Sequence, residues 1–185
     1  MASGLTPKQK KIIKELDEIY AAIGLDYWNI EYYDRESRTA VLELQMRKAI
    51  VGEIIVQYTL IDEMMNWAIC RHFFGTGRSS IKLWRTKKFQ NFNYYILESL
   101  YLLQKLKLIQ TFRRRIPKNI VEDICLLNDL RNAVAHAFFP ENLRRYKKWG
   151  KAVYKGKDIF TVEGMNLFIN DMERVNDFFI NKLTR

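Results

Sequence analysis

The sequence predicts an all-α protein, and three observations support this fold class. Apolar residues recur at intervals of three and four along most of the chain, which is the spacing of an amphipathic helix. Hydrophobic residues make up 48% of the chain, with only 8 glycines and 3 prolines to interrupt helices. A length of 185 residues suits one domain. We therefore expect a single domain over residues 1–185, a bundle of four or five helices with a small β-hairpin before the last one.

The first helix is expected over residues 6–24. Thr6 can cap its start, Pro7 suits its first position, and Gly24 is a natural stop. Residues 25–38 carry several aromatic side chains without a helical period, so they are predicted to form an ordered loop.

Residues 39–140 are predicted to form the helical core. A long helix should run from about Thr39 to Phe74 and end at Gly75, followed by a basic loop that continues to Phe92. The next two helices are expected from Asn91 or Asn93 to about Gln110, and from Pro117 to Phe138, where Pro140 stops the second.

Residues 141–161 should hold a basic segment and then the β-hairpin. Ala152–Tyr154 and Ile159–Thr161 have strand-like composition and flank residues 155–158, which contain a glycine. Thr161 can cap a last helix over residues 162–183.

Charge indicates the class of partner. Lys and Arg total 31 against 21 Asp and Glu, giving a net charge of +10 and a pI near 9.6. Such an excess favours a polyanion, and nucleic acid is the commonest one. The alternative is that the charge only keeps the protein soluble.

We expect a cytoplasmic protein. The N-terminal residues lack the apolar segment of a signal peptide, and every long hydrophobic run is interrupted by charge. Cys70 and Cys125 lie in apolar, helix-like runs without metal-ligand spacing, so both are predicted to be buried free thiols.

The stretch Arg131-Asn132-x-x-x-His136 carries the candidate chemistry. Arg131 falls at the edge of the apolar arc of its helix, where a cation is costly unless it is paired. Acidic residues of the long helix are the candidate partners: Glu53, Asp62 and Glu63. On an ideal helix Arg131 and His136 lie roughly 140° apart, so one helix does not aim both at one atom, whereas two copies about a twofold axis could bring both pairs into one cleft.

This stretch resembles the R-x4-H motif of HEPN domains, which also favour Asn after the Arg. The resemblance implies a helical homodimer with the Arg131/His136 helices at its interface and metal-independent endoribonuclease activity. Arg131, His136 and Asn132 would be catalytic. His136 would transfer protons and Arg131 would hold the phosphate while the RNA 2′-OH attacks, leaving a 2′,3′-cyclic phosphate and a 5′-OH. The alternative is a non-catalytic HEPN-like regulator that binds RNA, a nucleotide or a protein.

Basic residues would then bind the RNA backbone, with Trp84, Tyr146 or Trp149 stacking on bases. These basic residues are Lys82, Arg85, Lys87, Lys88, Arg113, Arg114, Arg115, Arg144, Arg145, Lys147 and Lys148. No cofactor or metal is expected, and no membrane association. The resemblance implies a toxin, phage-defence or stress role with an antitoxin or regulatory partner. Phe138 stands where some HEPN toxins carry a tyrosine that their nucleotidyltransferase antitoxin modifies, so that form of neutralisation is not expected.

Overall fold

The computed structural model describes Pro7 and residues 34–75, 85–112, 116–137, 139–145 and 151–183. The predicted first helix, apart from Pro7, and most of the predicted loop 25–38 lie outside the described residues. The chain divides into two units, Met1–Gly52 and Glu53–Arg185. The single domain expected from the sequence stays a prediction.

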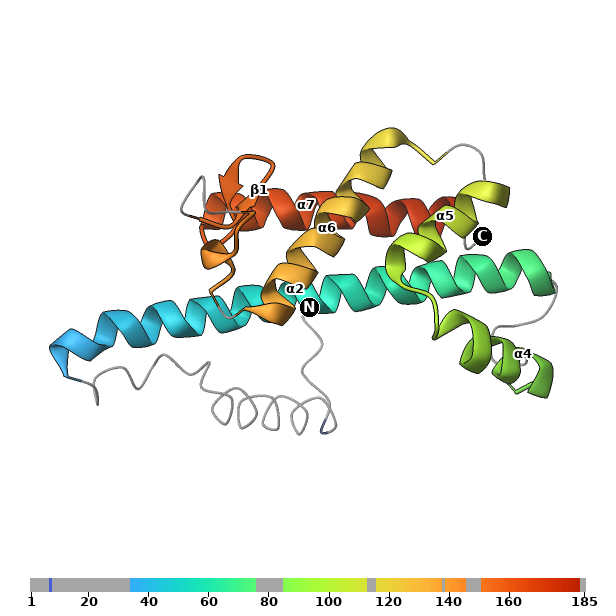
Figure 1. Cartoon of the computed structure of the whole chain (residues 1–185), viewed down its shortest axis with the longest axis horizontal. Coiled ribbons are helices and arrows are strands. Elements are labelled where there is room, and N and C mark those ends of the chain that lie inside the picture. The colour runs from blue at the N-terminus through green and yellow to red at the C-terminus, as the bar shows by residue number, and fades with distance from the viewer. Residues whose placement is uncertain are drawn as a thin grey trace. The chain divides into compact units, whose positions relative to one another are not determined.

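Helix α2 spans Arg35–Phe74 and contributes residues to both units (Figure 1). It begins four residues before the predicted start, because the Asp34 carboxylate accepts hydrogen bonds from the Ser37 backbone N–H at 2.9 Å and from its hydroxyl at 2.7 Å. The predicted loop is therefore wrong over the residues that open this helix. The predicted end agrees, since Gly75 has a φ of 81° and stops the helix.

The second unit continues with further helices and one hairpin, which confirms the all-α class. The elements are α4 (Lys87–Phe92), the π-helix η2 (Asn93–Leu97), α5 (Leu102–Phe112), α6 (Lys118–His136), the 3-10 helix η3 (Pro140–Asn142), β1 (Val153–Tyr154), β2 (Lys157–Asp158), α7 (Val162–Phe178) and the π-helix η4 (Phe179–Leu183).

The core of this unit is built from one buried stripe on each long helix. Helix α6 packs against both α5 and α7, and the hairpin lies against α7 (Figure 1). The three-and-four spacing of the sequence places the apolar side chains inward. The stripes are Ile61, Met65 and Ile69 of α2, Leu102, Leu106 and Ile109 of α5, Ile120, Ile124 and Leu127 of α6, and Phe168, Met172 and Val175 of α7.

Two helix boundaries differ from the predictions. The predicted loop up to Phe92 already contains α4, because the Thr86 hydroxyl accepts a hydrogen bond from the Phe89 N–H and caps the helix. The predicted helix to Gln110 is broken at residues 98–101, between η2 and α5.

Helix α6 ends at His136, two residues before the predicted end. Ala137 is extended, with φ −151° and ψ 127°. Pro140 begins a separate 3-10 turn, and a proline disfavours helical conformation in the residue before it.

The predicted β-hairpin is present, but its second strand is Lys157–Asp158, inside the predicted turn, so the strand predicted at Ile159–Thr161 is wrong. Val153 pairs with Asp158 and Tyr154 with Lys157, so the turn is two residues long. Lys155 and Gly156 have φ values of 46° and 83°, the left-handed conformations that suit such a turn.

Two buried carboxylates and two exposed cations join the hairpin to α6 and α7. Lys155 Nζ lies 2.6 Å from Asp123 Oδ1, an ion pair without hydrogen-bond geometry, and donates to Asp171 Oδ2 at 2.6 Å. Arg174 donates to both carboxylates, and the Tyr154 hydroxyl donates to Asp171 at 3.0 Å. Because the two cations balance the two anions, we assign this cluster a structural role: it holds the hairpin against α6 and α7.

The two cysteines differ in exposure. Cys70 is buried in α2, and burial raises the pKa of its thiol to about 12. Cys125 is exposed on α6, so the prediction that it is buried is wrong. It lies on the side of the helix away from the apolar stripe.

None of the helices in the described ranges has the length and hydropathy needed to cross a membrane.

Candidate functional site

Arg131 lies half-buried on α6, at the edge of the core, as its position in the sequence predicted. Its guanidinium carbon is 4.9 Å from the centre of the Tyr58 ring, which belongs to α2. One guanidinium nitrogen donates a hydrogen bond to the Asn132 side-chain oxygen at 3.2 Å. An aromatic face is a favourable support for a guanidinium, and it leaves the in-plane N–H groups available to other acceptors.

None of the three predicted acidic partners pairs with Arg131 in the described part of the chain. Glu53 accepts a hydrogen bond from Gln57 at 2.7 Å. Both oxygens of Asp62 are held by the Lys105 ammonium, at 2.8 and 2.7 Å. Glu63 is exposed. The guanidinium therefore keeps hydrogen-bonding capacity for an external anion.

Tyr58 is the centre of a small group of charges. Burial raises the pKa of its phenol, the positive charge of Arg131 lowers it, Asp62 raises it, and a backbone hydrogen bond at Leu102 lowers it. The net effect is a raised pKa, so the phenol stays neutral at physiological pH.

His136 is the last residue of α6 and its side chain is exposed. It lies roughly 140° around the helix from Arg131, by ideal helix geometry. Asn132, predicted to orient His136 or to bind phosphate, instead accepts its hydrogen bond from Arg131. Within one chain the structure thus joins Arg131 to Asn132 and leaves His136 on a separate face.

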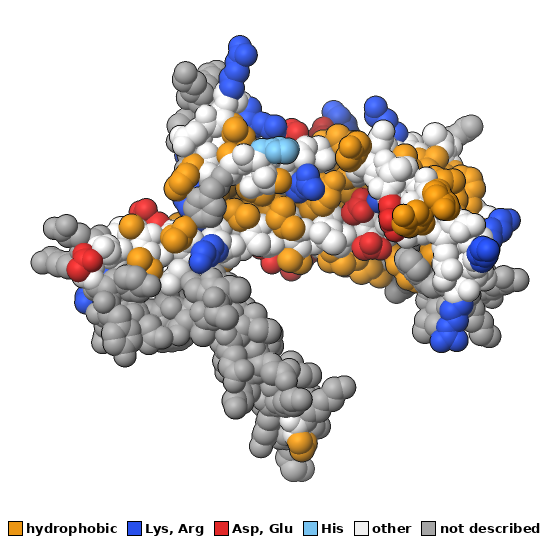
Figure 2. Space-filling view, turned by 60° about the horizontal axis from the view of Figure 1, so that its bottom comes forward, with side chains coloured by type: hydrophobic (Ala, Val, Ile, Leu, Met, Phe, Trp, Pro, Cys, Tyr) orange, Lys and Arg blue, Asp and Glu red, His pale blue; other side chains and the backbone are white. Residues whose placement is uncertain are grey.

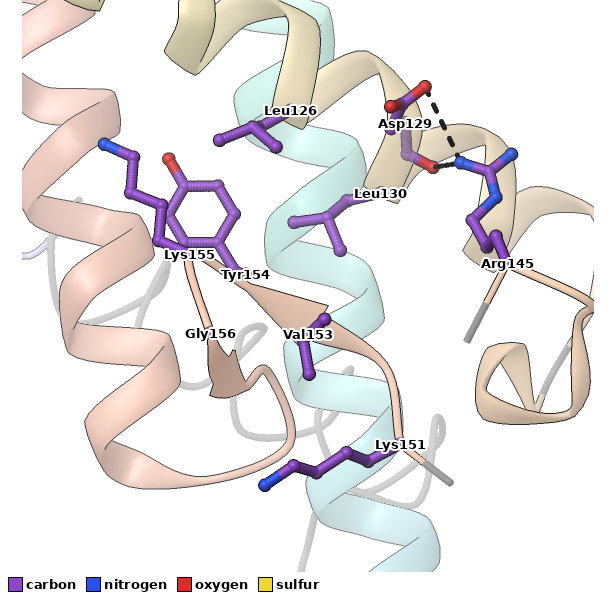
Figure 3. Close-up of a pocket in the computed structure, with 9 residues that line it drawn as sticks. All are labelled: Leu126, Asp129, Leu130, Arg145, Lys151, Val153, Tyr154, Lys155 and Gly156. Carbon is purple, nitrogen blue, oxygen red and sulfur yellow. Dashed lines mark hydrogen bonds and ion pairs between the residues drawn. The ribbon is translucent and has the colours of Figure 1, made fainter. Parts of the chain in front are cut away.

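A pocket of about 410 Å³ lies between α6 and the hairpin (Figure 3). Leu126, Leu130 and Val153 form its apolar wall, while Arg145 is bonded across one rim to Asp129. Arg131 does not line this pocket. It faces the opposite side of α6, so the pocket is separate from the candidate site.

The predicted RNA-binding residues fall into two groups. Those described by the structure are exposed: Arg85, Lys87, Lys88, Arg144 and Arg145. The others lie outside the described residues: Lys82, Arg113, Arg114, Arg115, Lys147 and Lys148. Phe138 and the stacking candidates Trp84, Tyr146 and Trp149 also lie outside them.

The segment that follows Lys87 and Lys88 also exposes three tyrosines. Tyr94 is 65% exposed, Tyr95 71% and Tyr101 76%. The rings of Tyr94 and Tyr95 meet edge to face with centroids 4.9 Å apart. Figure 2 shows hydrophobic and basic side chains close together at the right-hand end of that view, where α4 and α5 lie.

Sequence reasoning missed Tyr58 and Lys105. Tyr58 lies five residues after Glu53 and four before Asp62, on the same helix as the acids considered. Its spacing from Asp62 could have placed both on one face. Nothing in the local sequence distinguishes Lys105 from an exposed lysine, because its burial depends on a carboxylate 43 residues away.

These features define a helical protein with a cation–aromatic site at the edge of its core. Comparison with protein-family models, curated proteins and solved structures finds no match for the chain. Across the described residues, no group of His, Cys, Asp and Glu side chains is gathered as a metal site would require.

Proposed function

We propose that this protein is a HEPN-type, metal-independent endoribonuclease that acts as a homodimer. The observation that carries the proposal is the state of Arg131, a half-buried cation that rests on Tyr58 and has no acidic partner among the described residues. It lies five residues before the exposed His136 that ends the same helix. A supported guanidinium and a nearby imidazole are suitable groups for metal-free phosphodiester cleavage.

The proposed reaction uses the RNA's own 2′-OH as nucleophile. An imidazole of His136 accepts the 2′-OH proton or returns a proton to the 5′ oxygen as the P–O5′ bond breaks. Arg131 donates to the non-bridging oxygens, where negative charge accumulates in the transition state. The products are a 2′,3′-cyclic phosphate and a 5′-OH.

The separation of Arg131 and His136 in one chain favours a site completed by a second copy. Two α6 helices related by a twofold axis would place the arginine of one chain beside the histidine of the other. Ala133 is buried within its own chain, so the contact between the two helices must use exposed residues such as Ala135.

Substrate binding is proposed along the exposed basic residues. Lys87 and Lys88 would contact phosphates, and Tyr94, Tyr95 and Tyr101 would stack on unpaired bases. Exposed lysines beside exposed aromatic rings suit single-stranded RNA. We place such an enzyme in the cytoplasm, in a toxin, phage-defence or stress role with an antitoxin or regulatory protein as partner.

The experiment is an RNA cleavage assay in EDTA with purified protein. We expect wild-type cleavage to persist without metal, and His136→Ala and Arg131→Gln to lower the rate by about two to four orders of magnitude. His72→Ala is the matched control, because His72 lies in the last turn of α2 and stacks on Phe112, 3.9 Å between ring centroids. Its activity should stay at the wild-type level.

The alternative function is binding of RNA, a nucleotide or a protein without cleavage, and the distance between Arg131 and His136 around one helix favours it. Under this alternative the RNA stays intact at high protein concentration, while gel shifts still show a steep salt dependence. Phosphorylation of the new 5′ ends by a kinase, and resistance of the 3′ ends to ligation, would instead identify the cleavage products proposed.

A further inference from the structure

Lys105 of α5 is buried against a carboxylate, with its side chain only 3% exposed. Its ammonium donates to both oxygens of Asp62, which is 24% exposed. Burying an ammonium is costly unless an anion compensates it, so this pair is tightly held. Asp62 therefore has little remaining capacity for another cation on the Lys105 side.

Asp62 lies one helical turn after Tyr58, on the same face of α2. The Tyr58 ring supports the Arg131 guanidinium at 4.9 Å. Arg131 and Asp62 both act electrostatically on the Tyr58 phenol, so the two charges lie around the same ring. A carboxylate not held by Lys105 would be a natural bidentate partner for this guanidinium.

We propose that Lys105 is a positioning residue: by holding Asp62, it keeps the carboxylate from occupying Arg131, so that the guanidinium on Tyr58 is open to a phosphodiester. Tyr58 is the second positioning residue, through its ring rather than its hydroxyl. That the anion is an RNA phosphate rests on the proposed function. The competition between Asp62 and an external anion for Arg131 does not depend on that function.

The test measures binding of a short single-stranded RNA by gel shift in a His136→Ala background, where no cleavage occurs. Lys105→Met removes the ammonium and keeps a long apolar side chain. Asp62 then pairs with Arg131, and we expect RNA affinity to fall about tenfold. Adding Asp62→Asn to Lys105→Met removes the competing charge and should restore the affinity.

The Arg131→Gln background separates positioning from a merely structural role, because a loosened fold would lower the affinity there as well. Failure of Asp62→Asn to restore binding would overturn the proposal. Unchanged affinity in Lys105→Met would also overturn it. In an Arg131→Gln background, Lys105→Met should have no further effect, because the group that Asp62 blocks is already absent. Circular dichroism and urea unfolding of each variant establish that it is folded.

Tyr58 offers an independent pair of variants. Tyr58→Phe keeps the ring, so RNA affinity should stay within about twofold of the parent, and Tyr58→Leu should lower it roughly threefold or more. Equal losses in both variants would assign the effect to the hydroxyl and contradict the proposal. All these experiments measure RNA binding and not cleavage. If the protein fails to cleave RNA in EDTA, the proposed activity is wrong, but the role of Lys105 is still tested by the binding experiments.

Discussion

The contacts of Arg131 show how a charged residue is accommodated at the edge of an apolar core. A guanidinium has five N–H donors in one plane, and its planar faces are weakly hydrated. It can therefore stack on an aromatic ring with little loss of hydration. Tyr58 provides that ring and Asn132 takes one donor. The donors that remain are what a phosphate needs.

Gly164 is the residue whose size is most strictly limited by its surroundings. It lies in the first turn of α7, where a Cβ would stand 2.0 Å from the Asp158 carbonyl oxygen and 2.7 Å from its carbonyl carbon. Because these are backbone atoms of the hairpin, they cannot move without separating the hairpin from α7.

We expect Gly164→Ala to lower the free energy of unfolding by about 2 kcal/mol through overpacking. Gly52→Ala is the matched control, since a Cβ at Gly52 in the interior of α2 meets nothing within 4 Å. It should raise the free energy of unfolding by roughly 0.5–1 kcal/mol through helix propensity. Urea unfolding measures both, and equal effects of the two substitutions would contradict this account.

At the scale of elements, the hairpin is tied to two helices by charges that depend on pH. Burial raises the pKa of Asp171. Hydrogen bonds from Lys155 and Tyr154, together with the charges of Lys155 and Arg174, lower it by more than burial raises it, so the net pKa lies below the ordinary 3.8. A carboxyl with a lowered pKa in the folded state stabilises the fold when it is ionised.

This stabilisation is fully present above the unfolded-state pKa and is lost as the pH falls through the lowered pKa of the folded state. We therefore expect the free energy of unfolding to decrease as the pH falls below about 4. In Asp171→Asn the same titration should give a shallower decrease, because the titrating group is gone. Urea unfolding between about pH 2 and 6 measures both slopes. Parallel curves would show that Asp171 does not contribute to the acid sensitivity.

The helices around the candidate site also show what local signals can and cannot define. Thr86 and Asp34 cap helices that start earlier than predicted, although both are ordinary capping residues. The break at residues 98–101 has a weaker local signal, because the Gln104 side-chain oxygen accepts a hydrogen bond from the Tyr101 backbone N–H at 2.8 Å just before α5 begins.

At the scale of the whole molecule, the proposed active site requires two chains. We expect Arg131→Gln and His136→Ala to be inactive when assayed separately. Mixed and allowed to exchange subunits, they should regain about a quarter of the wild-type activity, because half of the dimers are mixed and each mixed dimer has one intact arginine–histidine site.

The control mixes Arg131→Gln with the double variant Arg131→Gln/His136→Ala, which has no intact site in any combination. Sedimentation velocity establishes that the chains form dimers and exchange. If the mixture of single variants stays as inactive as this control, each site is contained in one chain and the composite arrangement is wrong.

The sequence by itself determined the helical class, the end of α2 at Gly75, the capped start of α7 at Thr161 and the buried stripe of α6. These features depend on local conformational preferences and on the period of apolar residues, both of which are readable along the chain. The position of Arg131 at the edge of that stripe was predictable for the same reason.

Only the tertiary structure decided which groups meet around Arg131. The sequence offered three acids as its partners, whereas the fold places it on a tyrosine ring and gives Asp62 to a lysine 43 residues away. Pairing of this kind depends on how helices distant in sequence pack together. Local spacing cannot specify it, because each side chain is compatible with several partners until the helices are docked.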